Sequence, residues 1–129
     1  MTETGSKQVK VLLADDSEFM LRAVARLLRT TSQVALIGTA VDFAEAVRLA
    51  DEHKPDVVVL DLHMAQQAKA DVLRLKAGDC KPRLLAITAA NVKHEGSLAL
   101  ASAIGADRLL DKMSLEEELI PAILELASN

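Results

Sequence analysis

The sequence has very few aromatic residues and a single cysteine. Its 129 residues include two phenylalanines but no tryptophan or tyrosine, so the core must be built from aliphatic side chains. The one cysteine, Cys80, excludes an internal disulfide and is typical of a reducing compartment. The sequence shows no signal peptide and no apolar run long enough to span a bilayer. We therefore expect a cytoplasmic protein that makes no membrane contact.

An excess of positive charge is also missing. The formal net charge is −4 at pH 7, which argues against the positive field of nucleic-acid-binding domains, and we expect no direct nucleic acid binding by this chain. Half of the residues are apolar and 26% are charged, as in soluble globular domains. The length suits one domain with its own core. We expect a flexible N-terminal tail over residues 1–8 and one domain over residues 9–129.

Short apolar runs alternate with amphipathic segments along the chain. The apolar runs predict five strands, at Val9–Ala14, Val34–Ala40, Asp56–Leu60, Arg83–Thr88 and Arg108–Asp111. The segments after them predict helices, including one at 66–77, one from about 92 to 104, and a last one with a kink or restart near Pro121. The alternation and the nearly all-apolar strands indicate an α/β fold. We expect a three-layer, doubly wound, five-stranded parallel sheet in the flavodoxin-like order 2-1-3-4-5.

The residues at the ends of these strands form the most informative pattern. In a doubly wound sheet, ligands bind outside the carboxyl ends of the strands, where the strand order reverses. Strands one, three and four are neighbours in the expected order, so their final residues should converge on one pocket. The residues that end or directly follow the strands are Asp15 and Asp16, Asp61, Thr88, and Lys112.

Three carboxylates in one pocket need a proton or a cation nearby. Two carboxylates about 4 Å apart repel by roughly 4 kcal/mol at an effective dielectric constant near 20. Mg²⁺ prefers such oxygen ligands and typically binds one or two carboxylates together with waters and a phosphate. A carboxylate beside it is a competent nucleophile toward phosphorus, and Lys112 and Thr88 could neutralise and hydrogen-bond the new oxygens. The pocket therefore has the parts of a metal-assisted phosphoryl transfer.

Four motifs in a fixed order resemble the response-regulator receiver domain of bacterial two-component signalling. They are L-L-A-D-D-S, P-D-V-V-V-L-D-L-H-M, A-I-T-A and G-A-D-R-L-L-D-K, and with their spacing they cover the chain from Val9 onward. The resemblance implies a chemotaxis-type receiver in which Asp61 accepts a phosphoryl group. The Thr88 hydroxyl would then contact that group, and Lys112 would pair with it.

The same resemblance implies a divalent metal site for Mg²⁺ (or Mn²⁺). Asp16 would bind the metal directly, whereas Asp15 would act mainly through water. Asp61 and the backbone carbonyl of His63 would complete the protein ligands.

The resemblance also implies partners and a signalling role rather than an enzymatic one. The phosphodonor would be a sensor histidine kinase, a phosphotransfer protein or a small acyl phosphate. Phosphorylation would switch the surface formed by the fourth helix, the fifth strand and the fifth helix, which would bind a downstream protein target. The domain would be a phosphoacceptor that assists its own phosphorylation and dephosphorylation, not an enzyme with an external substrate.

Three positions depart from the pattern of the family. The family usually has a proline four residues after the phosphoacceptor and a glycine eight residues after it, where this chain has Ala65 and Lys69. Leu109 stands where the family commonly has an aromatic switch residue. We therefore expect an altered entry into the third helix and a signal that is transmitted without the usual threonine–aromatic switch.

Three other functions stay open from the sequence alone. A phosphatase resembling the haloacid-dehalogenase group also uses an aspartate nucleophile, but that group normally repeats the acid two residues on, where this chain has His63. A non-signalling, receiver-like adaptor would bind partners without phosphorylation. The chain could also be the receiver half of a DNA-binding transcriptional regulator, although we expect a stand-alone receiver.

Some of these residues also have plainer explanations. Asp15 and Ser17 both suit a helix N-terminus. The His63 side chain is expected to face solvent near the site, where it could modulate water attack on the acyl phosphate or have no role. Three methionines are expected to fill the core or the site wall: Met20, Met64 and Met113.

Overall fold

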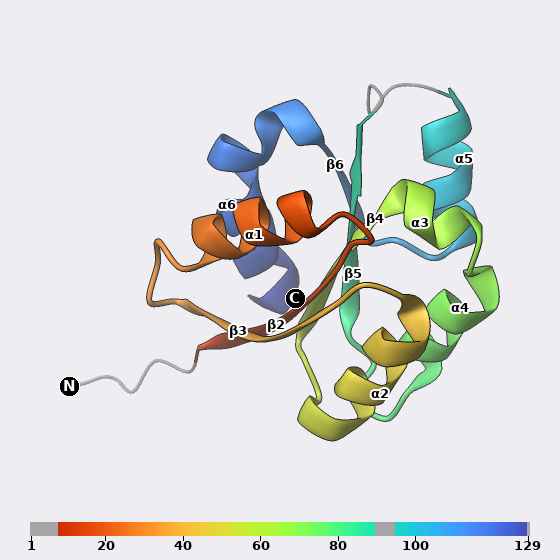
Figure 1. The fold of residues 1–129 in the computed structure, drawn as a ribbon, viewed down its shortest axis with the longest axis horizontal. Coiled ribbons are helices and arrows are strands. Elements are labelled where there is room, and N and C mark those ends of the chain that lie inside the picture. The colour runs from red at the N-terminus through yellow and green to blue at the C-terminus, as the bar shows by residue number, and fades with distance from the viewer. Residues whose placement is uncertain (1–7, 90–94, 129) are drawn as a thin grey trace.

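The sheet has the predicted strand order. The computed structural model describes residues 8–89 and 95–128 (Figure 1). Five parallel strands pair in the order β3-β2-β4-β5-β6, which is 2-1-3-4-5 when the strands are counted along the chain. The expected flexible tail lies, apart from Gln8, outside the described residues. The strands are β2 (Val9–Ala14), β3 (Val34–Ala40), β4 (Val57–Asp61), β5 (Arg83–Thr88) and β6 (Arg108–Asp111).

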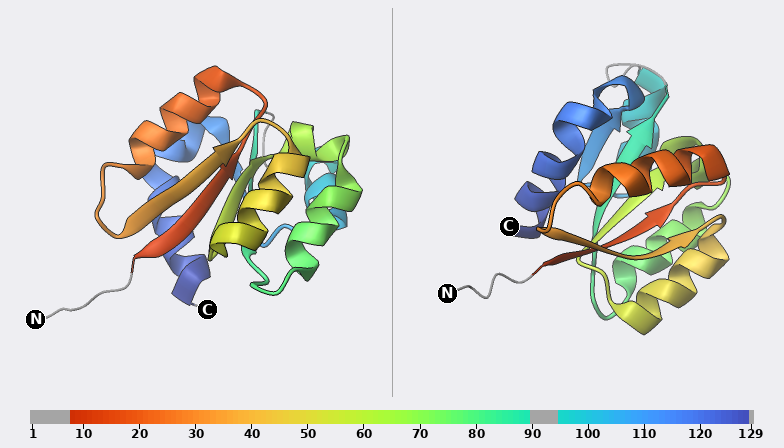
Figure 2. Two further views of the ribbon diagram at one scale, coloured as in Figure 1. Left: turned by 60° about the horizontal axis from the view of Figure 1, so that its bottom comes forward. Right: turned by 60° about the vertical axis from the view of Figure 1, so that its left-hand side comes forward.

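Helices cover both faces of this sheet, as Figure 2 shows from two sides. Helices α1 and α6 lie on one face, and α2, α3, α4 and α5 lie on the other. The helices are α1 (Glu18–Leu28), α2 (Phe43–His53), α3 (Leu62–Gln66), α4 (Lys69–Ala77), α5 (Glu95–Ala103) and α6 (Leu115–Ser128), with a 3-10 turn η1 (Lys112–Ser114) before α6.

Two aliphatic cores lie on the two sides of the sheet. Strand residues alternate between them: Val11 and Leu13 of β2 face α1 and α6, whereas Leu12 and Ala14 face the other helices. All four are at most 2% exposed. Full burial of a valine or leucine side chain stabilises the fold by about 1.5–3 kcal/mol, so apolar residues on both faces of each strand favour the doubly covered sheet.

The helix predicted at 66–77 is found as α4 (Lys69–Ala77), a short helix α3 that was not predicted comes before it, and the preceding strand is shifted by one residue. The chain enters α3 directly after β4 because the Asp61 carboxylate caps it, accepting a hydrogen bond from Met64 N at 2.9 Å. Helix α4 then begins at Lys69, three residues later than predicted, and Gly78 caps its end, as the sequence indicates. Ala65 is fully buried within α3. The chain therefore leaves Asp61 through a helical turn.

The expected helix at 92–104 is found as α5, although its predicted start lies outside the described residues. Gly105 adopts a left-handed conformation (φ 73°) after the helix. Its neighbour Ala106 donates a backbone hydrogen bond to Ala101 O at 2.9 Å, which is how a glycine ends a helix. A Cβ at Gly105 would lie 3.0 Å from Lys76 Cδ, so both φ and space favour glycine there.

Two features near the C-terminus differ from the sequence expectations. Of the kink or restart expected near Pro121, the restart does not occur, because helix α6 runs through the proline. Buried side chains lie on both sides of the proline, Leu119 before it and Ile123 after it, and their burial offsets the roughly 3 kcal/mol cost of an internal proline. Met113 fills neither core nor site wall, because it lies in the turn η1 and is 91% exposed.

Candidate functional site

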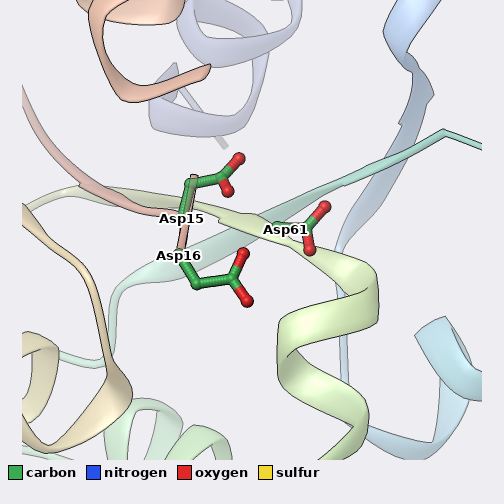
Figure 3. A group of neighbouring side chains, drawn as sticks. All are labelled: Asp15, Asp16 and Asp61. Carbon is green, nitrogen blue, oxygen red and sulfur yellow. The ribbon is translucent and has the colours of Figure 1, made fainter. Parts of the chain in front are cut away.

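Three carboxylates meet at the carboxyl edge of the sheet (Figure 3). Asp15, Asp16 and Asp61 each offer one oxygen, and these oxygens all lie within 4.8 Å of one another. They meet because β2 and β4 are paired neighbours, with Ala14 opposite Leu60, so both chains reach the same edge. The structure thus brings together the three acids that the sequence places at these strand ends.

Backbone hydrogen bonds hold two of the three acids in place. Asp15 is 8% exposed, and its Oδ1 accepts from Ser17 N at 2.9 Å. Ser17, rather than Asp15, caps α1, with its Oγ accepting from Met20 N at 3.3 Å. Asp61 is half-buried and is held by the Met64 N–H, and Asp16 is exposed to solvent. Capping and a metal site are therefore compatible, because each backbone contact occupies only part of a carboxylate.

The electrostatics of the site favour a bound cation. Burial raises the pKa of Asp15 despite the lowering effect of the Ser17 N–H, and the negative charges of Asp61 and Asp16 raise it further. Burial likewise raises the pKa of Asp61, with the charge of Asp16 adding to the rise. The ionised forms of Asp15 and Asp61 are therefore both destabilised at this site. An ion coordinated by all three would remove this penalty, and three carboxylates are the hard oxygen donors that suit Mg²⁺ or Mn²⁺.

Lys112 and His63 lie close enough to act on this charge. The positive charge of Lys112 lowers the pKa of both Asp15 and Asp61, and that of His63 lowers the pKa of Asp61. Lys112 is exposed in η1, directly after β6, and His63 is exposed in α3. Lys112, the cation that the sequence places after the fifth strand, thus lies near the acids. The His63 side chain faces solvent, as expected.

Thr88 lies at the end of β5, beside Asp61. Asp61 is paired with Ile87, so Thr88 is the next residue along the neighbouring strand. Its side chain is 6% exposed, and its Oγ1 lies 3.5 Å from Ser97 Oγ of α5. Ser97 is a further residue beside the site that the motifs do not include. Its sequence signal is a serine in a small, apolar helix segment, G-S-L-A-L-A, where a buried hydroxyl needs a partner.

The raised pKa values predict that the metal-free site destabilises the fold at neutral pH. A group whose pKa is raised on folding stabilises the folded state most below its unfolded pKa, and this contribution is lost as the pH rises through the folded pKa. We expect Asp15→Asn, which keeps an oxygen to accept from Ser17 N–H, to raise the metal-free Tm at neutral pH. The expected rise is about 3–5 °C, which is about 1 kcal/mol in a domain of this size. Thermal unfolding followed by circular dichroism checks this.

The difference should shrink as the pH falls toward the ordinary carboxyl pKa, because the wild-type acids then become protonated. Asp79→Asn is the matched control, since Asp79 is an exposed acid outside the site. A variant less stable than wild type at neutral pH would contradict this, because it would show that the Asp15 charge stabilises the metal-free fold.

A family model described as the response regulator receiver domain matches residues 11–124. The chain belongs to this family. A solved relative by fold is the response regulator domain of Thermotoga maritima CheB, with a TM-score of 0.83, 22% identity, and coverage of 95% of this chain and 98% of that one. The receiver domain of the response regulator NarL from Mycobacterium tuberculosis has a TM-score of 0.83 at 28% identity, with the same coverage.

Curated relatives of the receiver are longer proteins. The protein-glutamate methylesterase/protein-glutamine glutaminase 1 of Vibrio cholerae is 32% identical over 102 residues, which are 78% of this chain and 26% of that protein. The chain thus matches about a quarter of that protein's length. None of the helices in residues 8–89 and 95–128 is long and apolar enough to cross a membrane.

Proposed function

We propose that this receiver is a cytoplasmic phosphorylation switch in which Asp61 accepts a phosphoryl group with the help of Mg²⁺ or Mn²⁺. The observation that carries the proposal is the cluster of three carboxylates within 4.8 Å at the carboxyl edge, in a chain of the receiver family. Asp15, Asp16 and Asp61 would hold the ion, together with the His63 carbonyl. The bound ion would supply positive charge against the carboxylates and the phosphoryl oxygens.

The chain's own residues would carry out the transfer. The Met64 N–H holds Asp61 Oδ2 and so fixes the direction in which the other oxygen points. That oxygen would form a bond to phosphorus while the bond from phosphorus to the donor nitrogen or oxygen breaks. The donor leaves with the electron pair of the broken bond, as a neutral histidine side chain or as acetate, and Asp61 becomes an acyl phosphate. Lys112 would pair with the phosphoryl oxygens and Thr88 would donate a hydrogen bond to them.

The phosphodonor would be a sensor histidine kinase or a phosphotransfer protein, and the output a downstream protein target. The output surface would be α5, β6 and α6, because the added negative charge appears next to the ends of β5 and β6. Leu109 is a partly buried aliphatic residue packed against the core of β6 and α5, so this surface has no aromatic side chain to rotate at that position. The signal must reach α5 by another contact.

We expect acetyl phosphate with Mg²⁺ to add one phosphoryl group to each chain, which then hydrolyses slowly. Intact-mass spectrometry measures the addition, and release of inorganic phosphate measures the turnover. A switch gives a phosphorylated population and little activity on simple phosphomonoesters. Sustained turnover of phosphomonoesters without an accumulated phosphoprotein would instead indicate the phosphatase that the sequence left open. Absence of both would favour a receiver-like adaptor.

A further inference from the structure

A buried pair of hydroxyl groups connects the site to the expected output helix. Thr88 Oγ1 and Ser97 Oγ lie 3.5 Å apart, and either can be the donor. The two residues are 6% and 7% exposed, and they are two of only three buried polar or charged residues in the part of the chain that the structure describes. Thr88 belongs to β5 at the site, whereas Ser97 belongs to the first turn of α5.

The contact between Thr88 and Ser97 depends on where the Thr88 side chain places its hydroxyl oxygen. Threonine χ1 has separate staggered positions, so a Thr88 hydroxyl that turns toward an oxygen on Asp61 leaves Ser97. Ser97 would then be a buried hydroxyl without its present partner, which is unfavourable. A shift of the first turn of α5 would give it new hydrogen-bond partners.

The structure has room for that movement. A hollow of about 450 Å³ lies between α3 and α5, lined by both hydroxyl residues and by Leu62, Gln66 and Leu100 among others. A close-packed interior resists such repacking, whereas a hollow lets a helix shift without displacing other side chains. Leu98, next to Ser97, is 52% exposed on the outer side of α5, so a shift of this turn would change the output surface.

We propose that Ser97 is the positioning residue that couples Thr88 to α5. Ser97 would take the role that the family commonly gives to an aromatic residue at the position of Leu109. The proposal rests on the proposed function, since it needs an occupied site at Asp61. With the site empty, Ser97 holds the Thr88 hydroxyl. With the site occupied, Thr88 turns to the new oxygen, and the released Ser97 lets the first turn of α5 repack into the hollow.

The test uses the full chain with Mg²⁺ and beryllofluoride, a stand-in for the phosphoryl group. The chain lacks tryptophan, so tryptophan fluorescence cannot report binding. The affinity for beryllofluoride is measured by calorimetry, and the response of α5 is measured by amide hydrogen exchange. We expect Ser97→Ala to bind beryllofluoride about two- to fivefold more tightly, since Thr88 no longer leaves a partner. Beryllofluoride binding should change the amide hydrogen-exchange rates of α5. In Ser97→Ala we expect this change to be less than half of the change in wild type.

A double-mutant cycle separates this coupling from a general effect on stability. In a Thr88→Ala background, Ser97→Ala should leave the affinity unchanged, because the bond is already gone. Thr88→Ser keeps the hydroxyl and should restore the effect of Ser97→Ala. Ser102→Ala is the matched control, since Ser102 is an exposed serine on the same helix, and it should change neither quantity.

Equal effects of Ser97→Ala with and without the Thr88 hydroxyl would overturn the proposal. So would an undiminished response of α5 in Ser97→Ala. A wild-type chain that fails to bind beryllofluoride would contradict the proposed function itself. Normal binding by wild type together with an additive double-mutant cycle would contradict only the role of Ser97.

Discussion

Asp61→Asn is expected to abolish covalent phosphorylation by acetyl phosphate, with the labelling rate falling by more than about a thousandfold, as when an enzyme nucleophile is removed. The amide is a poor nucleophile, whereas its oxygen can still accept the Met64 N–H that caps α3. The fold should therefore be retained, and loss of labelling can be assigned to chemistry. Intact-mass spectrometry over time, with circular dichroism to check folding, makes the measurement.

Asp79→Asn serves as the matched control for this variant. The same acid-to-amide change is made there at an exposed position away from the strand ends, and it should leave the labelling rate unaltered. Labelling of Asp61→Asn at the wild-type rate would mean that another residue accepts the phosphoryl group.

Removing one carboxylate from the acid cluster should have the second largest effect, a loss of divalent-metal affinity. A unit charge about 4 Å from another contributes up to about 4 kcal/mol at an effective dielectric constant of 20, so we expect Asp16→Asn to weaken Mn²⁺ binding by at least about tenfold. Asp16 is exposed, so its replacement should not disturb the core. Electron paramagnetic resonance of free Mn²⁺ gives the dissociation constant, and competition gives that of Mg²⁺.

Phosphorylation should fall together with metal affinity. Wild-type protein treated with a chelator should behave like Asp16→Asn, and excess Mg²⁺ should restore the variant in part. Asp79→Asn again supplies the control of equal charge. Unchanged Mn²⁺ affinity in Asp16→Asn would show that the three neighbouring oxygens do not form the metal site.

The sheet and the acid cluster could be predicted because they depend on patterns that are local in the sequence. The apolar runs at the centre of the sheet are strands buried on both faces, and the alternation with helices leaves few ways to connect the strands. Asp15, Asp16 and Asp61 end two of these runs, so their meeting follows once the strand order is known. The family motifs then name the chemistry that three adjacent carboxylates only suggest.

Most of the parts that could not be predicted depend on tertiary contacts. The short helix α3 is the exception, since the Asp61 carboxylate caps it through Met64 N, three residues along the chain. Helix α6 tolerates Pro121 because packing against the sheet outweighs a local penalty. Met113 is apolar but lies in an exposed turn. The bond between Thr88 and Ser97 joins two elements whose relative placement is known only from the fold.

Borohydride trapping tests the central claim most directly. An acyl phosphate on aspartate is reduced by borohydride to the alcohol of homoserine, which tandem mass spectrometry locates in the sequence. After acetyl phosphate and Mg²⁺ treatment, the predicted result is homoserine at position 61 and at no other aspartate, with none formed when Mg²⁺ is chelated. Homoserine at another position, or a phosphoryl group that resists borohydride on a serine, threonine or histidine, would contradict it.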